Sequence, residues 1–363
     1  MIGYLNHQKI PIPKHRNSKK PTTNIESLEA ILLKREDEVL DKILELRHIK
    51  KAESYLSEAM VGPDGRIHPL YDYVNTGRLS SKRPNVMNLP QGRGSDIMLR
   101  ASKYIRNSFL PDEGYVFVEL DWRAIEPTLV AYFSGDNVYK RVCKFAHTYV
   151  LSLDINEPAS LDWDDNKLES YLEDLKRRWK DELRYHTIKT ANNAFNYKQG
   201  LYNMAKTLKV AVPEARRIRD LIAAAFPGIV RWQNETLLKA HAEGRLTNPF
   251  GHSRSFFSVL EKDGSMGREG NECLAELPQS TGASMLRWCL VELFNHPWHK
   301  DLFKLKIPIH DSILVQIKED HVAKVIEMIE GVMERKWPEL DGLSIEVESK
   351  WGKRMGEMKA WTN

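Results

Sequence analysis

The amino-acid sequence predicts an α+β fold in which a small antiparallel sheet is interrupted by a long helical insertion. Two segments predict the sheet. Residues 115–121, YVFVELD, alternate between an apolar and a partly polar face as a strand does, and residues 307–317, IPIHDSILVQI, place His310 and Asp311 between two apolar runs as a β-hairpin does. Between these segments, residues 123–243 carry mainly helical patterns.

The composition indicates a protein of more than one subdomain in a reducing cytosol. The 363 residues are enough for two or three subdomains. No apolar run approaches the roughly 18 residues of a membrane helix, so we expect no membrane association. The three cysteines are widely spaced and form neither a disulfide framework nor a zinc motif. The net charge of +4 is mildly basic, and the basic clusters are either phosphate contacts or solvated helix faces: residues 14–20, 47–51, 176–178 and 216–219.

The stretch before the first strand combines a polar start with one strong helical pattern. Residues 1–24 are polar, basic and proline-bearing, which is typical of a tail or of a segment that packs along something else. Residues 27–60 have apolar residues at helical spacings and predict a helix. The segment GPDGRIHP, residues 62–69, ends this helix, and the chain is irregular and polar to about residue 95.

The stretch after the first strand is mainly helical and returns to the sheet near its end. Helices are predicted over residues 174–197, 213–226, 229–242, 282–294 and 321–337, a short hairpin over 243–257 and a final strand over 343–351.

Two acids hold comparable places in this predicted sheet. Asp121 ends the first strand, and Asp311 lies in the hairpin turn. Two carboxylates that converge on one sheet edge would suit a pair of hard divalent cations, because Mg²⁺ prefers oxygen ligands. From the hairpin alone, an ordinary solvated turn is the simpler interpretation of His310 and Asp311.

Six segments together resemble family A DNA polymerases, the DNA polymerase I type. TGRLSSKRPNVMNLPQ and LPQSTGAS are similar to conserved segments of that family, DWRAIEPTLVAYFSGD resembles its motif A, KTANNAFNY its motif B and IHDSI its motif C, while FPGIVRWQNETLLKAHAEGRLTNPFGHSR resembles the later fingers. The order and spacing match the family, and the resemblance covers roughly residues 25–360.

The resemblance implies a right-hand polymerase fold with an antiparallel-sheet palm, helical fingers and a reduced thumb. The predicted divisions are an N-terminal basic extension at 1–26, a reduced thumb and entry to the palm at 27–75, the first palm segment at 76–135, the fingers at 136–270 and the second palm segment at 271–363. The stretch before residue 76 is too short for a 3′ to 5′ exonuclease domain. We therefore expect no proofreading, and either low processivity or a protein partner that supplies the thumb contacts.

The resemblance also implies the catalytic and metal-binding residues. Asp121 and Asp311 match the two metal-binding aspartates, and the backbone carbonyl of Trp122 would be a further ligand to two Mg²⁺ ions, for which Mn²⁺ can substitute. Lys189 matches the lysine that contacts the incoming triphosphate and protonates the leaving pyrophosphate. Without the motif, Lys189 would be interpreted as a solvated helical lysine.

Substrate and DNA contacts follow from the same resemblance. Glu126 matches a steric gate against the ribose 2′ hydroxyl, and Tyr197 matches the tyrosine that borders the nascent base pair. Arg78 matches an arginine that reaches the minor groove, where correctly paired bases share acceptors. Further polar contacts to template or primer are implied for Asn85, Asn88, Gln279 and His310, although any one of them could be an ordinary loop residue.

Several positions depart from the family pattern. The family has an arginine four residues before Lys189, where this chain has Tyr185, and Arg184 lies about 100° further around the helix. Asn193 stands where the family has an aromatic residue that discriminates sugars. We keep Arg184 and Asn193 as candidate substrate contacts. Motif C ends in Ser312 rather than glutamate, which removes a peripheral carboxylate, and we expect activity to survive.

These observations predict a template-directed, Mg²⁺-dependent DNA polymerase that adds deoxynucleoside triphosphates to a primer on template DNA in bacterial or phage-infected cytosol. A polymerase with relaxed template or sugar choice, such as a reverse transcriptase or a translesion type, is one alternative. A non-catalytic DNA-binding subunit derived from a polymerase is another. The retention of Asp121, Asp311 and Lys189 together argues against the binding subunit.

Overall fold

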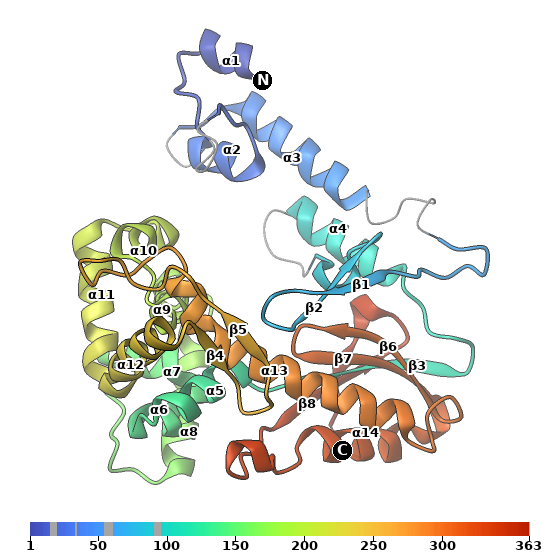
Figure 1. Ribbon diagram of the computed structural model, residues 1–363. Helices are drawn as coiled ribbons and strands as arrows, with labels where there is room; N and C mark the ends of the chain where they lie inside the picture. Colours follow the sequence, from blue (N-terminus) through green and yellow to red (C-terminus); the bar gives the residue numbers. More distant parts are fainter. Residues whose placement is uncertain (15–19, 33–34, 54–60, 91–95, 363) are drawn as a thin grey trace. The chain divides into compact units, whose positions relative to one another are not determined.

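The computed structural model describes residues 1–363 apart from 15–19, 33–34, 54–60, 91–95 and 363 (Figure 1). The described chain forms two compact units. The first comprises Met1–Tyr71, Ser81–Phe117 and Gly352–Lys359, and the second comprises Asp72–Ser80, Val118–Trp351 and Ala360–Asn363. The combination of helices and a sheet confirms the predicted α+β class, whereas the five predicted divisions of the chain remain predictions.

The N-terminal part of the first unit is a small helical cluster. It contains α1 (Ile2–His7), α2 (Ile25–Leu32) and α3 (Glu38–Glu53), which share a core of Leu5, Ile10, Leu28, Ile31 and Leu40. The helix predicted over 27–60 is therefore wrong as a single element. Asp37 accepts a hydrogen bond from the Leu40 amide at 3.1 Å and starts a new helix at Glu38. The end of that predicted helix, residues 54–60, lies outside the described residues.

The remainder of the first unit includes α4 (Asp96–Asn107) and two 3₁₀ turns, η2 (Val86–Asn88) and η6 (Met355–Glu357). Asn107 donates a hydrogen bond to Glu357 at 2.9 Å, which ties α4 to η6. The strands β1 (Leu70–Tyr73) and β2 (Leu79–Lys82) form a two-stranded sheet. The segment Asp72–Ser80, which holds the adjoining halves of both strands and the turn between them, belongs to the second unit.

A five-stranded sheet with the order β6-β7-β3-β8-β9 carries the predicted acids. Its strands are β3 (Tyr115–Trp122), β6 (Phe303–Ile309), β7 (Ser312–Lys318), β8 (Val347–Gly352) and β9 (Lys359–Ala360). Strands β6 and β7 are antiparallel with Ile309 opposite Ser312, so the predicted first strand and hairpin are confirmed. The final strand starts at Val347 rather than 343, because Leu343 forms an isolated bridge with Trp337.

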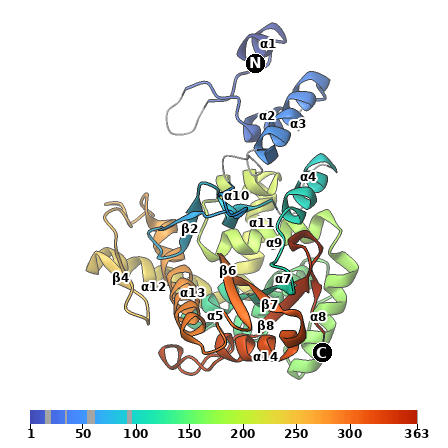
Figure 2. The same ribbon diagram turned by 90° about the vertical axis from the view of Figure 1, so that its right-hand side faces the viewer.

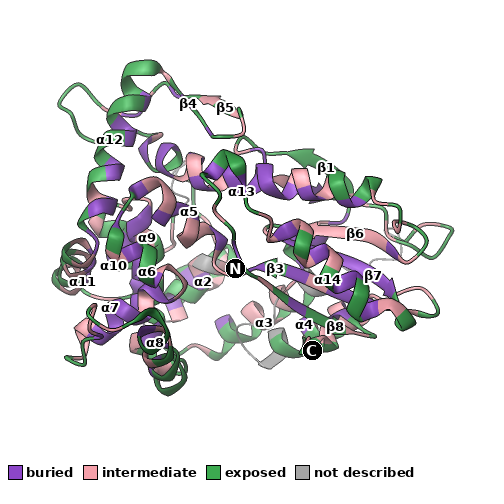
Figure 3. Cartoon of the chain, turned by 90° about the horizontal axis from the view of Figure 1, so that it is seen from below, coloured by how far each residue is buried: buried purple, intermediate pink, exposed green. Residues whose placement is uncertain are grey.

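Two helices of the second unit pack beside this sheet. They are α13 (Gly270–Asn295) and α14 (Val322–Met333), and α14 contacts both α13 and β7 (Figure 2). Long stretches of α13 and β7 are buried (Figure 3). The indole nitrogen of Trp122 donates to the Met333 carbonyl at 3.1 Å, so the end of β3 is fixed to the end of α14.

The helical insertion of the second unit has one continuous core that extends from Val130 to Trp232. Its elements are α5 (Ile125–Ser134), α6 (Asn137–Val142), η3 (Cys143–Phe145), α7 (Ala146–Asp154), α8 (Asp165–Trp179), α9 (Leu183–Asn196), α10 (Leu201–Leu208), α11 (Val212–Ala225) and α12 (Pro227–Glu243). Buried Asp136 joins two of them, because it accepts hydrogen bonds from Tyr139 at 2.8 Å and Gly228 at 2.6 Å. The predicted short hairpin follows as β4 (Arg245–Thr247) and β5 (Ser253–Ser255).

Candidate active site

Asp121 is presented by the end of strand β3. The strand alternates as predicted, with Leu120 and Trp122 buried while Asp121 is exposed. Because side chains two residues apart share a face of a strand, Glu119 points to the same side as Asp121. The apolar neighbours thus anchor the strand and leave its acidic face available to a ligand.

Asp311 is held in the two-residue turn between β6 and β7, as predicted. His310 takes the left-handed conformation with φ of 53°, and the Ile309–Ser312 pair closes the turn. The Asp311 side chain is 24% exposed, so it is largely enclosed but still accessible. Strand β7 is the neighbour of β3 in the sheet, and the contact between Ser312 and Glu119 brings this turn toward the end of β3.

Neighbouring charges and lost solvation perturb both carboxyl groups. Loss of solvation in the surrounding protein, followed by the negative charges of Asp311 and Glu119, raises the pKa of Asp121 to about 6, although part of its surface is exposed. Burial also raises the pKa of Asp311, while the positive charge of Arg78 opposes that rise. Acids that repel each other in this way favour a bound cation.

Arg78 bridges the acids of this site. Its guanidinium lies 3.5 Å from Asp311 and 3.8 Å from Glu126, and its Nε is buried without a hydrogen-bond partner among the described residues. The unpartnered Nε–H is a spare donor beside two carboxylates. Arg78 therefore balances charge here and retains hydrogen-bonding capacity for a ligand.

Glu126, in the first turn of α5, collects two more predicted residues. Its Oε1 accepts hydrogen bonds from the Tyr197 hydroxyl and, at 3.3 Å, from Gln279 of α13. Burial and then the charge of Glu126 raise the pKa of the Tyr197 phenol well above its usual value, so the phenol remains a donor. Arg78, Glu126, Tyr197 and Gln279 thus form one connected group with Asp311.

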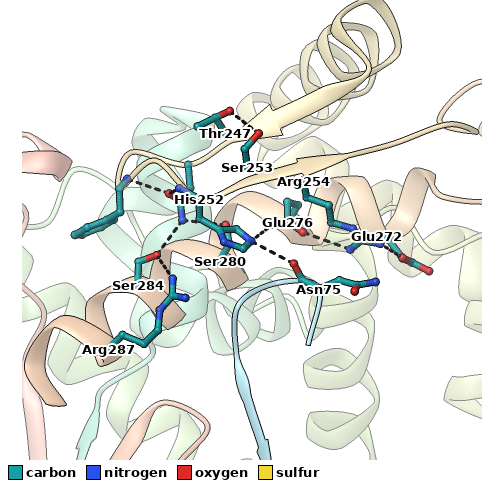
Figure 4. A network of polar contacts seen from close by, with 12 residues as sticks. Asn75, Thr247, His252, Ser253, Arg254, Glu272, Glu276, Ser280, Ser284 and Arg287 are labelled. Carbon is teal, nitrogen blue, oxygen red and sulfur yellow. Dashed lines mark hydrogen bonds and ion pairs between the residues drawn. The ribbon is translucent and has the colours of Figure 1, made fainter. Parts of the chain in front are cut away.

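A second polar network positions the turn that carries Arg78 (Figure 4). The His252 ring lies 3.2 Å from the Asn75 carbonyl oxygen and 3.5 Å from buried Glu276 of α13, which also pairs with Arg254 at 3.3 Å. Gly77 has φ of +72°, and a Cβ there would lie 3.2 Å from His252. The turn between β1 and β2 is therefore fitted closely against the β4–β5 hairpin.

Helix α9 carries the other predicted substrate residues. Lys189 and Asn193 are exposed, and Tyr197 caps the end of the helix. Arg184 instead forms ion pairs with Asp154 at 2.5 Å and with Glu214 at 2.7 Å. Its role as a substrate contact stays a prediction.

Tyr185, at the position where the family has arginine, is part of the helical core. Its hydroxyl lies 2.7 Å from the His147 ring. Burial, followed by the charges of Lys189 and Lys176, lowers the pKa of His147 to about 3. His147 is therefore neutral, and the side chain of Tyr185 packs in the core.

The predicted DNA contacts fall in both units. Asn85 and Asn88 belong to the first unit. The Asn85 side chain caps the 3₁₀ turn η2 by accepting a hydrogen bond from the Asn88 backbone amide at 3.2 Å, which is an ordinary capping role. His310 is exposed beside Asp311. Sequence reasoning missed Glu119, whose i, i+2 relation to Asp121 on a strand was the available signal.

The donor set fits Mg²⁺. The described residues contain no group of three or more His, Cys, Asp or Glu side chains arranged to hold a metal. Mg²⁺ commonly uses one or two protein carboxylates together with water and substrate phosphates, which matches the Asp121 and Asp311 pair. None of the described helices is long and apolar enough to span a membrane.

Residues 3–357 match the family model described as DNA polymerase family A, and the chain belongs to this family. Among curated relatives, it is 26% identical over 347 residues to a thermostable DNA polymerase I of Thermus aquaticus, covering 93% of this chain and 38% of that protein. It is 26% identical over 343 residues to DNA polymerase I of Pseudomonas aeruginosa, covering 92% of this chain and 35% of that protein. The chain thus spans less than two-fifths of either relative.

One solved structure is similar over almost the whole chain. The structure of the POL domain of Pol1 from M. smegmatis, in complex with DNA primer-template and dNTP, superposes with a TM-score of 0.78 at 21% identity. The similarity covers 98% of this chain and 60% of that one. This confirms the predicted polymerase fold.

Proposed function

We propose that this chain catalyses template-directed addition of deoxynucleotides to the 3′ end of a DNA primer. The observation that carries the proposal is the charged group around Asp311. Arg78 lies 3.5 Å from Asp311 and 3.8 Å from Glu126, and Asp121 lies at the end of the neighbouring strand β3. Membership of the family supports this activity, and so does the similarity to a polymerase domain whose structure contains primer-template and dNTP.

In the proposed reaction, Asp121, Asp311 and the backbone carbonyl of Trp122 would hold two Mg²⁺ ions. Bound Mg²⁺ would supply the charge that lowers the pKa of the primer hydroxyl and stabilises the transferred phosphoryl group. Lys189, exposed on α9, binds the triphosphate and donates a proton to the leaving pyrophosphate. Arg78 shields the acids before substrate binds and then donates to the minor groove of the primer terminus.

The same geometry supports selection of deoxyribose. Glu126 is fixed by two donors, Tyr197 and Gln279, so its carboxylate has a defined position. A carboxylate held where the sugar binds would leave no space for a 2′ hydroxyl and so would exclude ribonucleotides. Selection for deoxyribose favours a DNA polymerase over the reading with relaxed sugar choice.

The proposal assigns DNA contacts to Asn85, Asn88, Gln279 and His310, and substrate contacts to Arg184 and Asn193. It also includes the expectation that this chain polymerises DNA without 3′ to 5′ proofreading. A protein partner that supplies further grip on the duplex, and a bacterial cytosolic location, belong to the same proposal.

Primer extension tests the proposal directly. A recessed DNA duplex, Mg²⁺ and four deoxynucleotides are incubated with the wild type, Asp121→Asn, Asp311→Asn and the control Asp320→Asn, which changes an exposed acid in the 3₁₀ turn η4 (Glu319–His321). We expect extension by the wild type and the control, and loss of at least about a thousandfold in both site variants. Duplex binding without extension, in Mn²⁺ as well as Mg²⁺, would contradict the proposal and favour a binding subunit.

A further inference from the structure

Glu119 stands beside the two predicted metal ligands without belonging to the motifs that identify them. It lies two residues before Asp121 on β3 and shares its face of the strand. Its side chain is partly exposed. The acidic face of β3 therefore consists of two carboxylates.

Ser312 connects Glu119 to the other acid. It directly follows Asp311 and is buried, with 3% of its surface exposed. Its hydroxyl oxygen lies 3.3 Å from Glu119 Oε1 and 3.1 Å from the Ile309 carbonyl oxygen, so its one hydrogen is shared between two acceptors. This hydrogen bond links the Glu119 carboxylate on β3 to Ser312, at the start of the neighbouring strand β7 and next to Asp311.

Motif C of this chain has serine at the position where the family has its third acid, and the structure brings a carboxylate to that serine from the adjacent strand. We propose that Glu119, positioned by Ser312, is the third carboxylate of the Asp121 and Asp311 site and strengthens divalent-cation binding through its charge. This inference rests on the proposed metal-dependent function. It makes Glu119 a positioning residue for the ions rather than a direct ligand.

A purely structural role predicts different behaviour. If Glu119 only accepted the hydrogen bond of the Ser312 hydroxyl, Glu119→Gln would leave Mn²⁺ affinity almost unchanged, because glutamine retains an acceptor oxygen of the same reach. If its charge acts on the cation, the amide weakens binding, and added salt reduces the difference between the two proteins because it screens the interaction.

The test measures Mn²⁺ affinity of the free chain by electron paramagnetic resonance, so that it does not depend on turnover. We expect Glu119→Gln to weaken Mn²⁺ binding by about tenfold at low salt, as outer-shell partners of a metal do. The control Asp320→Asn removes a charge from an exposed residue of η4, and we expect a change of less than about twofold.

An exchange of the two residues separates the role of the carboxylate from the role of the side chain that carries it. Glu119→Ser combined with Ser312→Glu moves the acid from β3 to β7, and we expect Mn²⁺ affinity to return to within about threefold of the wild type. Thermal unfolding confirms that each variant is folded. Failure of a folded exchange variant to recover affinity would overturn the inference.

Two further outcomes distinguish the inference from the proposed function. If Asp121→Asn and Asp311→Asn lose Mn²⁺ binding while Glu119→Gln binds as the wild type does, the third-carboxylate role is wrong and the two-acid site stands. If both aspartate variants bind Mn²⁺ as tightly as the wild type, the proposed metal site itself is wrong.

Discussion

Asp121 gives the sharpest prediction, because its protonation competes with the cation that it is proposed to hold. Its pKa is raised to about 6 by lost solvation and by the charges of Asp311 and Glu119. At pH 7 about ten Asp121 side chains in eleven are ionised, and at pH 5 about one in eleven. Metal binding requires the ionised form, so we expect Mn²⁺ affinity to fall by about tenfold between pH 7 and pH 5.

The sign of this effect follows from the raised pKa. An ordinary aspartate, with a pKa near 3.9, would stay ionised over that range and give almost no pH dependence. The same shift also means that this group favours the folded state less as pH rises from about 4 to about 6, because the folded protein binds the extra proton. The raised pKa of Asp121 therefore lowers the free energy of unfolding at neutral pH, where the side chain is ionised.

The assay is a Mn²⁺ titration at pH 5, 6 and 7, at constant ionic strength. Lys350, on β8, lowers the Asp121 pKa, so Lys350→Gln should move the midpoint of the pH dependence upward. Equal Mn²⁺ affinity at pH 5 and pH 7 in the wild type, or an unmoved midpoint in Lys350→Gln, would refute the reasoning.

Three other substitutions probe separate parts of the structure. Glu126→Ala removes the proposed sugar gate, and we expect ribonucleotide incorporation relative to deoxynucleotide incorporation to rise at least about tenfold in single-nucleotide extension; an unchanged ratio would remove Glu126 from sugar selection. Lys189→Ala should lower kcat by about a hundredfold or more with little change in duplex affinity, measured by single-turnover kinetics and fluorescence anisotropy; equal losses in both would indicate a DNA contact instead. Gly228→Ala would place a Cβ 2.7 Å from Asp136 Oδ2, and we expect the free energy of unfolding, measured by urea titration, to fall by about 1–3 kcal/mol. The control Gly331→Ala has open space around its Cβ and should not reduce the free energy of unfolding.

Local sequence pattern was sufficient for the strands that carry the acids. The alternation over 115–121 and the polar pair between apolar runs at 307–317 predicted β3 and the β6–β7 hairpin, and the turn does hold Asp311. The helix over 27–60 was wrong because a single aspartate at position 37 both caps a new helix and accepts from Tyr4 at 2.9 Å. That cap was visible in the sequence but was outweighed by the strong apolar spacing around it.

Contacts between distant parts of the chain were beyond the reach of pattern. Tyr197 and Gln279 meet at Glu126 from 71 and 153 positions away, and only the packing of α5, α9 and α13 brings them together. Likewise, Arg184 pairs with Asp154, 30 positions earlier, which no helical periodicity indicates. The family resemblance proposed the residues, and the tertiary structure shows the contacts between them.

The two hydrogen bonds that hold Glu126 have a consequence for redesign of this chain. On the proposed function, Tyr197 touches the forming base pair while its hydroxyl fixes the residue that inspects the sugar. One side chain then contacts both features of the same nucleotide, so a substitution of Tyr197 changes both checks. A Tyr197 variant that accepts modified sugars would be expected to copy its template less accurately.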